Sequence, residues 1–307
     1  MLSAVLGYFG PPGTFTHQAL LTFSQDEAVP FPTVGAALDA VRRGTTDSVL
    51  VPIENSVEGG VSATLDALSQ EPRLMIVREV LLPVQFGLYV RPGTTFSEVR
   101  RALTHPHAAA QVRHWFASNV PDAVLVEGGS TAAAAQEVAD PSSSYQAAIC
   151  AQVAADLYGL VPLATAIADN PDAVTRFVEV TRPGPPPQPT GADKTTLVAY
   201  MYADHPGALL EILEQFSGRG VNLCRIESRP TKAFLGDYFF SIDAEGHLQD
   251  ARLAEALLGL HRICREVLFL GSYRRADGVP PTVRRGFSDP EFRSATEWFH
   301  TLLAPDE

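Results

Sequence analysis

The stretch NPDAVTRFVEV at residues 170–180 and the proline-rich stretch RPGPPPQP that begins at Arg182 decide the domain organisation of this chain. Residues 175–180 are rich in β-branched and apolar side chains, which favours a strand. The prolines cannot continue a helix or a sheet, because proline fixes φ and lacks a backbone N–H. We therefore expect a stiff, extended linker at residues 183–193 that separates two folded parts.

The part before the linker alternates between strand and helix patterns. We expect strands at residues 5–9, 47–53, 123–127, 147–150 and 175–180, a second set of elements beginning near 84–90, and helices at 14–23, 34–41, 64–68, 108–117, 131–138 and 151–158. This alternation predicts an α/β fold with an open, largely parallel sheet that binds ligands at the carboxyl ends of its strands. Because residues 175–180 can pair back with the first strands, we expect two lobes around one cleft. The expected domain covers residues 1–182, with lobe 1 at about 1–80 and 160–182 and lobe 2 at about 81–159.

The part after the linker has the pattern strand, helix, strand, strand, helix, strand. The strands are expected at residues 195–202, 222–228, 238–243 and 267–270, and the helices at 207–216 and 253–260. This βαββαβ order is typical of a ferredoxin-like domain, which we place at residues 194–272. The tail at residues 273–307 lies outside both domains, and we expect Trp298 to anchor a terminal helix there.

Composition limits the classes of partner. The chain has 307 residues with 46% hydrophobic content, which is enough for more than one packed core. Its 35 acidic and 23 basic residues give a formal net charge of -12. Such a charge repels nucleic acids and anionic membranes, so neither is an expected partner. An anionic small molecule would need a local basic group, for which Arg176 is the candidate.

Cysteine usage favours a reducing compartment. Cys150, Cys224 and Cys264 lie far apart without the spacing of metal ligands, and their odd number argues against a disulfide framework. The chain starts without a basic leader and has no apolar run of the roughly 18 residues that a membrane span needs. We therefore expect a cytoplasmic protein. Cys150 is expected to be a small buried apolar group and not a nucleophile.

Thr175, Arg176 and Phe177 open the last strand of the first part. In a strand, Thr175 and Phe177 share one face while Arg176 points to the other. The Thr175 hydroxyl can donate a hydrogen bond to a leaving oxygen, and the Arg176 guanidinium can pair with a carboxylate. The alternative interpretation is an exposed arginine beside a β-favouring threonine.

Glu54, Asn55 and Ser56 follow a buried strand and precede a helix, where α/β sheets place their ligands. A functional Glu54 would act as a general acid or orient its neighbours. The alternative is that Asn55 or Ser56 caps the next helix.

Thr104 and His105, with Gln111 one helical turn past His107, supply hydroxyl, imidazole and amide groups at another strand-to-helix turn. The two histidines lack the i, i+4 spacing of a zinc helix, so we expect no metal site.

Two glycine-containing turns offer further polar groups. Ser130 and Thr131 follow a glycine pair and either bind a ligand or cap the helix that they open. The turn GPPG at residues 10–13 lacks the lysine and the spacing of a phosphate-binding loop. We therefore expect no nucleotide cofactor.

The start of the helix at residues 207–216 offers a second binding site. Asp204 can cap this helix, and Gly207 leaves room for a ligand to approach unpaired amides. The acid, hydroxyl and base at residues 227–229 can complement the charges of an amino acid. An ordinary capped helix is the alternative. The residues expected to contact an effector are Asp204, Gly207, Ala208, Leu209, Leu210, Glu227, Ser228, Arg229 and Pro230.

Together, these motifs resemble the prephenate dehydratase family with its C-terminal ACT domain. The resemblance runs from about Gly7 to about Leu270 and rests on residues 10–16 (GPPGTFT), 52–56 (PIENS), 104–106 (THP) with Gln111, 130–132 (STA), Asn170 with 175–177 (TRF), 207–210 (GALL) and 227–230 (ESRP). It implies a two-lobed, periplasmic-binding-protein-like catalytic domain with its active site in the cleft. It also implies ACT domains that pair between subunits and bind phenylalanine.

The resemblance implies roles for individual residues. The implied catalytic residues are Thr175, Arg176, Glu54, Asn55, Thr104 and Gln111, with Thr175 as the essential hydroxyl and Arg176 as the partner of a substrate carboxylate. The implied substrate-binding residues are Phe177, Ser56, Ser130, Thr131, Asn170 and His105. One departure is His107, which stands where the family often has glutamine.

The implied reaction is the decarboxylating dehydration of prephenate to phenylpyruvate in phenylalanine biosynthesis. The aromatic ring that forms supplies the driving force, so neither a metal nor a redox cofactor is required. We expect a homodimer or homotetramer that phenylalanine inhibits through the ACT domain. The alternatives are an arogenate dehydratase, whose substrate carries an amino group in the side chain, and a non-enzymatic amino-acid sensor.

Overall fold

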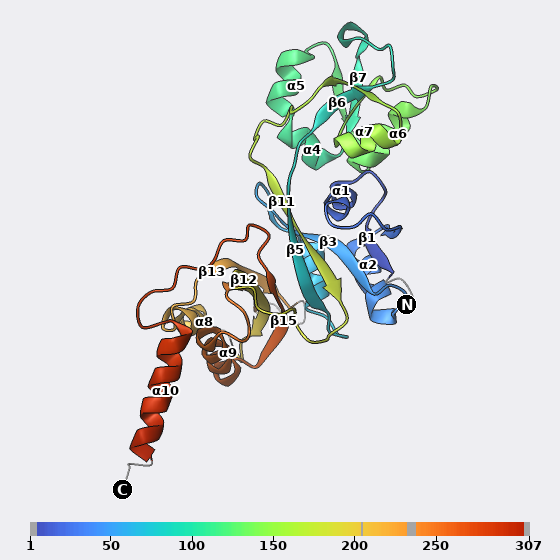
Figure 1. Cartoon of the computed structure of the whole chain (residues 1–307). Helices are drawn as coiled ribbons and strands as arrows, with labels where there is room; N and C mark the ends of the chain where they lie inside the picture. Colours follow the sequence, from blue (N-terminus) through green and yellow to red (C-terminus); the bar gives the residue numbers. More distant parts are fainter. Residues whose placement is uncertain (1–4, 204, 232–237, 304–307) are drawn as a thin grey trace. The chain divides into compact units, whose positions relative to one another are not determined.

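The chain forms two compact units in the computed structural model, which describes residues 5–203, 205–231 and 238–303 (Figure 1). Unit 1 consists of residues 1–64 and 80–178, and unit 2 consists of residues 65–79 and 179–307. The chain passes between the units within α3 (Ser62–Leu68), β5 (Met75–Pro83) and β11 (Val174–Thr181). The domain limits expected from the sequence stay predictions.

The first sheet has the strand order β2-β1-β3-β11-β5, with the short β4 beside β3. Besides α3, β5 and β11, its elements are β1 (Leu6–Phe9), α1 (Phe15–Leu21), β2 (Ala28–Phe31), α2 (Val34–Arg43), β3 (Ser48–Asn55) and β4 (Gly59–Gly60). Strand β1 pairs in parallel with both β2 and β3. Tyr8, Leu20 and Phe177 pack into the core of this sheet, and their burial removes apolar surface from water. Thr14 caps α1, because its hydroxyl oxygen accepts a hydrogen bond from the amide of His17.

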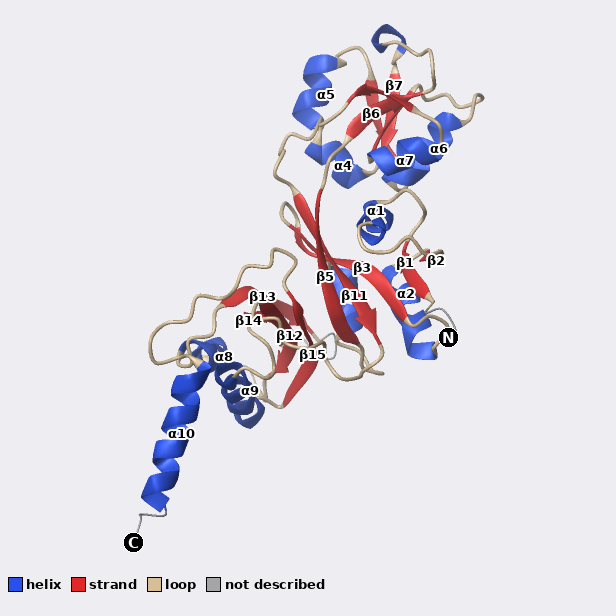
Figure 2. Ribbon diagram, in the orientation of Figure 1, coloured by secondary structure: helices blue, strands red, loops and turns tan. Residues whose placement is uncertain are grey.

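The second sheet of unit 1 has the order β10-β6-β9-β7-β8, and helices α4 to α7 surround it (Figure 2). Its elements are β6 (Gly87–Val90), the 3-10 helix η1 (Phe96–Glu98), β7 (Arg101–Thr104), α4 (Pro106–Gln111), α5 (Arg113–Asn119), β8 (Val124–Glu127), α6 (Thr131–Ala139), β9 (Ala147–Cys150), α7 (Gln152–Leu157) and β10 (Val161–Ala164). Strand β7 runs parallel to β8 and β9, whereas β6 runs antiparallel to β9 and β10. The largely parallel sheet expected from the sequence is therefore a mixed sheet in this part of unit 1.

The single helix expected at residues 108–117 is wrong. The chain leaves helical geometry at Val112, where φ is -123° and ψ is 9°, and α5 begins anew at Arg113. The cause lies in a distant residue. The carboxylate of Asp169 accepts hydrogen bonds from the amides of His114 and Trp115, at 2.9 Å each. The carboxylate thereby satisfies two amides in the first turn of α5. No local sequence pattern predicts this second helix.

Unit 2 contains a sheet with the order β13-β14-β12-β15. Its elements are β12 (Asp193–Tyr200), α8 (Ala208–Ser217), β13 (Leu223–Pro230), β14 (Tyr238–Glu245), α9 (Ala251–Ile263) and β15 (Glu266–Arg274), followed by α10 (Asp289–Leu303). The pairs β12/β14, β12/β15 and β13/β14 are all antiparallel. The expected βαββαβ plan is confirmed. The expected role of Trp298 as an anchor is wrong, because its side chain is 63% exposed. Within the described ranges, no helix combines the length and the apolar composition that crossing a membrane requires.

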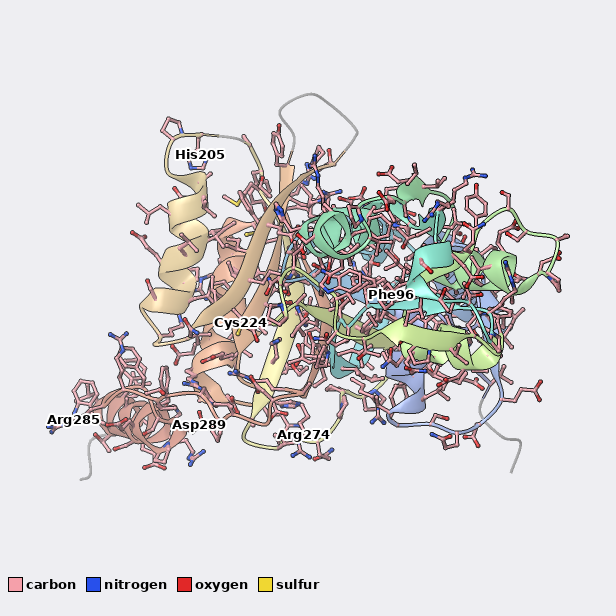
Figure 3. All side chains as sticks on the ribbon, turned by 90° about the horizontal axis from the view of Figure 1, so that it is seen from above. Phe96, His205, Cys224, Arg274, Arg285 and Asp289 are labelled. Atoms are coloured by element: carbon pink, nitrogen blue, oxygen red, sulfur yellow. The ribbon has the colours of Figure 1, made fainter. Side chains whose placement is uncertain are left out.

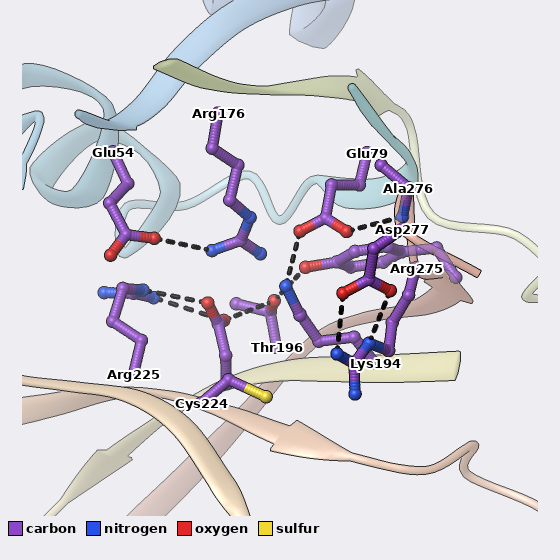
Figure 4. A network of polar contacts seen from close by, with 12 residues as sticks. Glu54, Glu79, Arg176, Lys194, Thr196, Cys224, Arg225, Arg275, Ala276 and Asp277 are labelled. Atoms are coloured by element: carbon purple, nitrogen blue, oxygen red, sulfur yellow. Dashed lines mark hydrogen bonds and ion pairs between the residues drawn. The ribbon is translucent and has the colours of Figure 1, made fainter. Parts of the chain in front are cut away.

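A buried ion pair ties β5 to β12 inside unit 2. The ammonium of Lys194 donates a hydrogen bond to Oε1 of Glu79, and the amide of Ala276 donates to Oε2 at 2.9 Å (Figure 4). The Glu79 side chain is almost fully buried, and that of Lys194 nearly so. Burial of two charges is tolerated when they face each other and their remaining polar atoms are bonded.

Removing one member of this pair should destabilise unit 2. Glu79→Ala leaves the Lys194 ammonium buried without this carboxylate, so we expect the free energy of unfolding to fall by about 3 kcal/mol. Guanidinium denaturation would measure it. Glu71→Ala is the matched control, because Glu71 pairs with Arg73 in solvent and such pairs contribute little. Equal stability of the two variants would contradict a contribution from the buried pair.

Candidate functional site

Unit 1 contains a cavity of about 650 Å³, which is in the size range of small-molecule sites. Its wall combines an apolar side, which includes Phe9, Phe15 and Phe86, with polar groups from both sheets of the unit. The candidate residues of the sequence that lie on the wall are Asn55, His105, Gln111, Ser130, Thr131, Thr175 and Phe177. The cavity thus unites residues from six segments of the chain.

Thr175 is oriented inside the cavity by Asn55. The side-chain amide of Asn55 donates a hydrogen bond to Oγ1 of Thr175 at 2.8 Å. The amide oxygen of Asn55 is used separately, because it accepts from the amides of Val57 and Glu58. This fixes which end of the Asn55 amide faces the threonine. Since the Thr175 oxygen accepts from Asn55, its hydroxyl hydrogen can be donated to a molecule in the cavity.

Arg176 and Glu54 lie outside the wall of this cavity. Thr175 and Phe177 face it, while the guanidinium of Arg176 points the other way and pairs with Oε2 of Glu54 at 3.3 Å (Figure 4). The expected alternation along the strand is confirmed. This placement differs from the predicted roles of Arg176 as a partner of a substrate carboxylate and of Glu54 as an acid at the site.

Three further predicted site residues also make contacts away from the wall. The buried Thr104 hydroxyl donates to the carbonyl oxygen of Ile149 at 2.7 Å. The Ser56 oxygen accepts from the amide of Val174, and the Asn170 side chain accepts from the amide of Asp172. Each of these groups stabilises a turn or a strand pairing near the cavity.

Gln111 presents an unused acceptor at the cavity. Its side-chain carbonyl oxygen is buried, and among the described residues this oxygen has no hydrogen-bond partner. A buried acceptor without a partner is costly.

The cavity wall carries no lysine or arginine within the described part of the chain. Instead, α1, α3, α4 and α6 each begin at the wall, with Thr14, Ser62, His105 and Ser130 at their starts. Helix N-termini carry partial positive charge and unpaired amides, which favour anions. Sequence reasoning identified some of these starts as caps and missed that they converge. Each helix start could be recognised from the turn that follows a strand. That these starts meet at one cavity depends on the tertiary fold.

Burial shifts the pKa of two predicted groups of unit 1. Burial lowers the pKa of His105, with the neighbouring His107 as a smaller cause, so its imidazole is neutral near pH 7. Burial raises the pKa of the Cys150 thiol to about 12, which agrees with the expected inert cysteine. Among the described residues, no group of three or more histidine, cysteine or acidic side chains could hold a metal ion.

Unit 2 has a smaller cavity of about 250 Å³ at the start of α8. Of the predicted effector residues, Gly207, Ala208, Leu209, Leu210 and Ser228 line it, together with Tyr238 and with His205 near the helix start (Figure 3). Gly207 has a φ of 97°, a left-handed conformation that favours glycine.

The other predicted effector residues lie elsewhere. Arg229 is bound by the Asp66 carboxylate through Nε at 3.1 Å and Nη2 at 2.7 Å. Glu227 accepts from Arg225 at 3.2 Å. Pro230 is not on the cavity wall, and Asp204 lies outside the described residues.

Residues 6–185 match the family model for prephenate dehydratase. The chain belongs to the prephenate dehydratase family. A prephenate dehydratase of Amycolatopsis methanolica is 48% identical over 95% of this chain and 96% of its own. The crystal structure of prephenate dehydratase from Arthrobacter aurescens in complex with L-Phe is similar with a TM-score of 0.93 and 52% identity, over 98% of this chain and 99% of that chain. The quorum-quenching acylase GqqA is also similar, with a TM-score of 0.80 and 31% identity over 88% of this chain and 97% of its own.

In this prephenate dehydratase family member, Asn55→Asp separates the two functions of the Asn55 amide. The variant keeps an oxygen for the amides of Val57 and Glu58, but it replaces the donor to Thr175 by an acceptor. We expect kcat to fall about a hundredfold, because the carboxylate would hold the Thr175 proton away from the substrate. Formation of phenylpyruvate, followed by its ultraviolet absorbance, would measure it.

The control for this variant is Asn119→Asp. The Asn119 amide donates to the carbonyl oxygen of Trp115 at an exposed helix end. A kcat of Asn55→Asp within about threefold of the parent would remove the orienting role of Asn55.

Proposed function

We propose that the family's reaction, the conversion of prephenate to phenylpyruvate with loss of carbon dioxide and water, takes place in the cavity of unit 1, and that Thr175 assists it. The observation that carries this proposal is the hydrogen bond from Asn55 to Thr175. It leaves the hydroxyl hydrogen as the donating end of Thr175, in a cavity of suitable size.

The reaction breaks two bonds in the substrate. The bond between the ring and its carboxylate breaks, and its electron pair enters the ring as carbon dioxide leaves. The ring carbon–oxygen bond breaks at the same time, and the departing hydroxide takes a proton to become water. Thr175 donates its hydrogen bond to this departing oxygen. A threonine hydroxyl is a weak acid, so it stabilises the developing charge or relays a proton from water.

We propose that uncharged groups, and not a lysine or arginine, bind the two substrate carboxylates. The amides and hydroxyls at the helix starts, Ser130 and Thr131 of α6 among them, are the proposed donors. The Ser130 oxygen accepts from the amide of Ala133 at 3.0 Å, which leaves its hydrogen for a ligand. We assign Arg176 and Glu54 a positioning role, in which their ion pair holds the adjacent strands β3 and β11 together.

The fold alone does not select this chemistry, since GqqA shares it and is described as an acylase. Arogenate stays an alternative substrate. Adding prephenate or arogenate in parallel and following the ultraviolet signal of phenylpyruvate or phenylalanine formation would distinguish the two.

Thr175→Val tests the proposed role of the hydroxyl. The substitution keeps the β-branched shape and removes the donor, so we expect kcat for prephenate to fall at least about a hundredfold. Steady-state turnover, with folding checked by circular dichroism, would measure it. Thr22→Val is the control, because the Thr22 hydroxyl donates to the carbonyl oxygen of Ala19 at the end of α1. Turnover of Thr175→Val within about threefold of the parent would show the role to be wrong.

We also propose that phenylalanine binds the cavity of unit 2 and inhibits the reaction. The related dehydratase from Arthrobacter aurescens forms a complex with L-Phe, and the start of α8 offers backbone amides to a carboxylate. Leu209 and Leu210 are 40% and 58% exposed on this apolar wall. Pairing of two copies through this domain would cover them, so a homodimer or homotetramer stays our prediction, as does a cytoplasmic location. Inhibition requires that phenylalanine bind the less active state more tightly.

Leu209→Ala should weaken the proposed effector site. Loss of apolar wall reduces the surface that the ligand buries, so we expect about tenfold weaker phenylalanine binding in calorimetry and an equal shift of the inhibition curve. Leu258→Ala is the control, since this exposed leucine of α9 does not line the cavity. Unchanged phenylalanine affinity in Leu209→Ala would place the effector elsewhere.

A further inference from the structure

We propose that His107 determines substrate preference by offsetting the charge of Glu58 at the rim of the catalytic cavity. Nδ1 of His107 contacts Oε2 of Glu58. Both residues line the cavity, and their side chains are 65% and 36% exposed. This inference rests on the proposed function, because it concerns how a doubly charged substrate enters the cavity.

The contact joins two segments from different sheets of unit 1. His107 lies in the first turn of α4, after the second sheet's β7, and Glu58 lies in the turn between β3 and β4 of the first sheet. The position of this turn is fixed by Asn55, whose side-chain oxygen accepts from the Glu58 amide at 3.2 Å. The residue that orients Thr175 therefore also holds Glu58 at the rim.

The charge of Glu58 is a barrier to an anionic substrate. In the described part of the cavity wall, Glu58 is the one acidic side chain, and neither lysine nor arginine is present. His105 is neutral near pH 7 because burial lowers its pKa, and Glu127 adds a further negative charge near His105. When protonated, His107 is the group on the wall that can offset the Glu58 carboxylate.

This offset acts unequally on the two candidate substrates. Prephenate carries two negative charges. Arogenate has an ammonium group in its side chain as well as two carboxylates, so its net charge is one negative charge. An uncompensated carboxylate repels the first more than the second and attracts an ammonium. His107 therefore favours prephenate over arogenate.

A double-mutant cycle tests this inference. His107→Gln keeps a polar side chain but cannot carry a positive charge. We expect its kcat/KM for prephenate to fall about fivefold, as is typical of exposed charge interactions, and the loss to appear in KM. The kcat/KM for arogenate should change less than twofold. In His107→Gln/Glu58→Gln, kcat/KM for prephenate should return to near the parental value, because the barrier is gone as well. High salt should reduce the effect of His107→Gln.

Other outcomes would overturn the inference. These are an equal loss for both substrates, a loss confined to kcat, or a double variant as impaired as His107→Gln. Glu58→Gln alone gives a further test, because it should keep or raise kcat/KM for prephenate, and a fall of more than threefold contradicts the barrier. A parental protein that turns over neither substrate would instead refute the proposed function.

Discussion

The hydrogen bond from Asn55 to Thr175 is the interaction on which the proposed catalytic site depends. It joins the end of β3 to the start of β11, two neighbouring strands of one sheet. Strand geometry then fixes the orientation of the neighbouring side chains, since alternate residues point to opposite faces. Thr175 and Phe177 face the cavity, and Arg176 is turned away to Glu54. The two faces of β11 thus separate the Thr175 hydroxyl, which faces the cavity, from the ion pair between Arg176 and Glu54.

The second constraint on the site is its charge. The chain has a net charge of -12, yet the described wall of the cavity holds no lysine or arginine. The helix starts on this wall supply partial positive charge without a mobile side chain, which favours an anion in the proposed site. Glu58 is the one acidic side chain on the described wall, and we propose that it and its neighbour His107 influence which anions enter.

Unit 2 shows how an element can serve two purposes. Helix α3 begins with Ser62 on the wall of the cavity of unit 1, and one turn later its Asp66 is bound by Arg229 of β13. The neighbour of Arg229, Ser228, lines the second cavity. Arg229 was a predicted effector contact on the basis of its charge. Its two hydrogen bonds to Oδ1 of Asp66 instead make it part of the framework, because the Nε and Nη2 donors that they use are not available to a ligand in the same geometry.

The sequence by itself determined the βαββαβ plan and the family, because apolar periodicity and spaced motifs are local properties of the chain. It also predicted that Arg176 faces away from Thr175, and it named Asn55, Gln111 and Thr175 as candidate site residues, all of which line the cavity. Tertiary structure decided the remainder. That Asp169 starts a new helix at Arg113, that Asn55 and not Glu54 contacts Thr175, and that Glu58 meets His107 depend on contacts between residues about 50 to 120 positions apart. No local pattern encodes such pairs, since they arise when separate strands and helices pack.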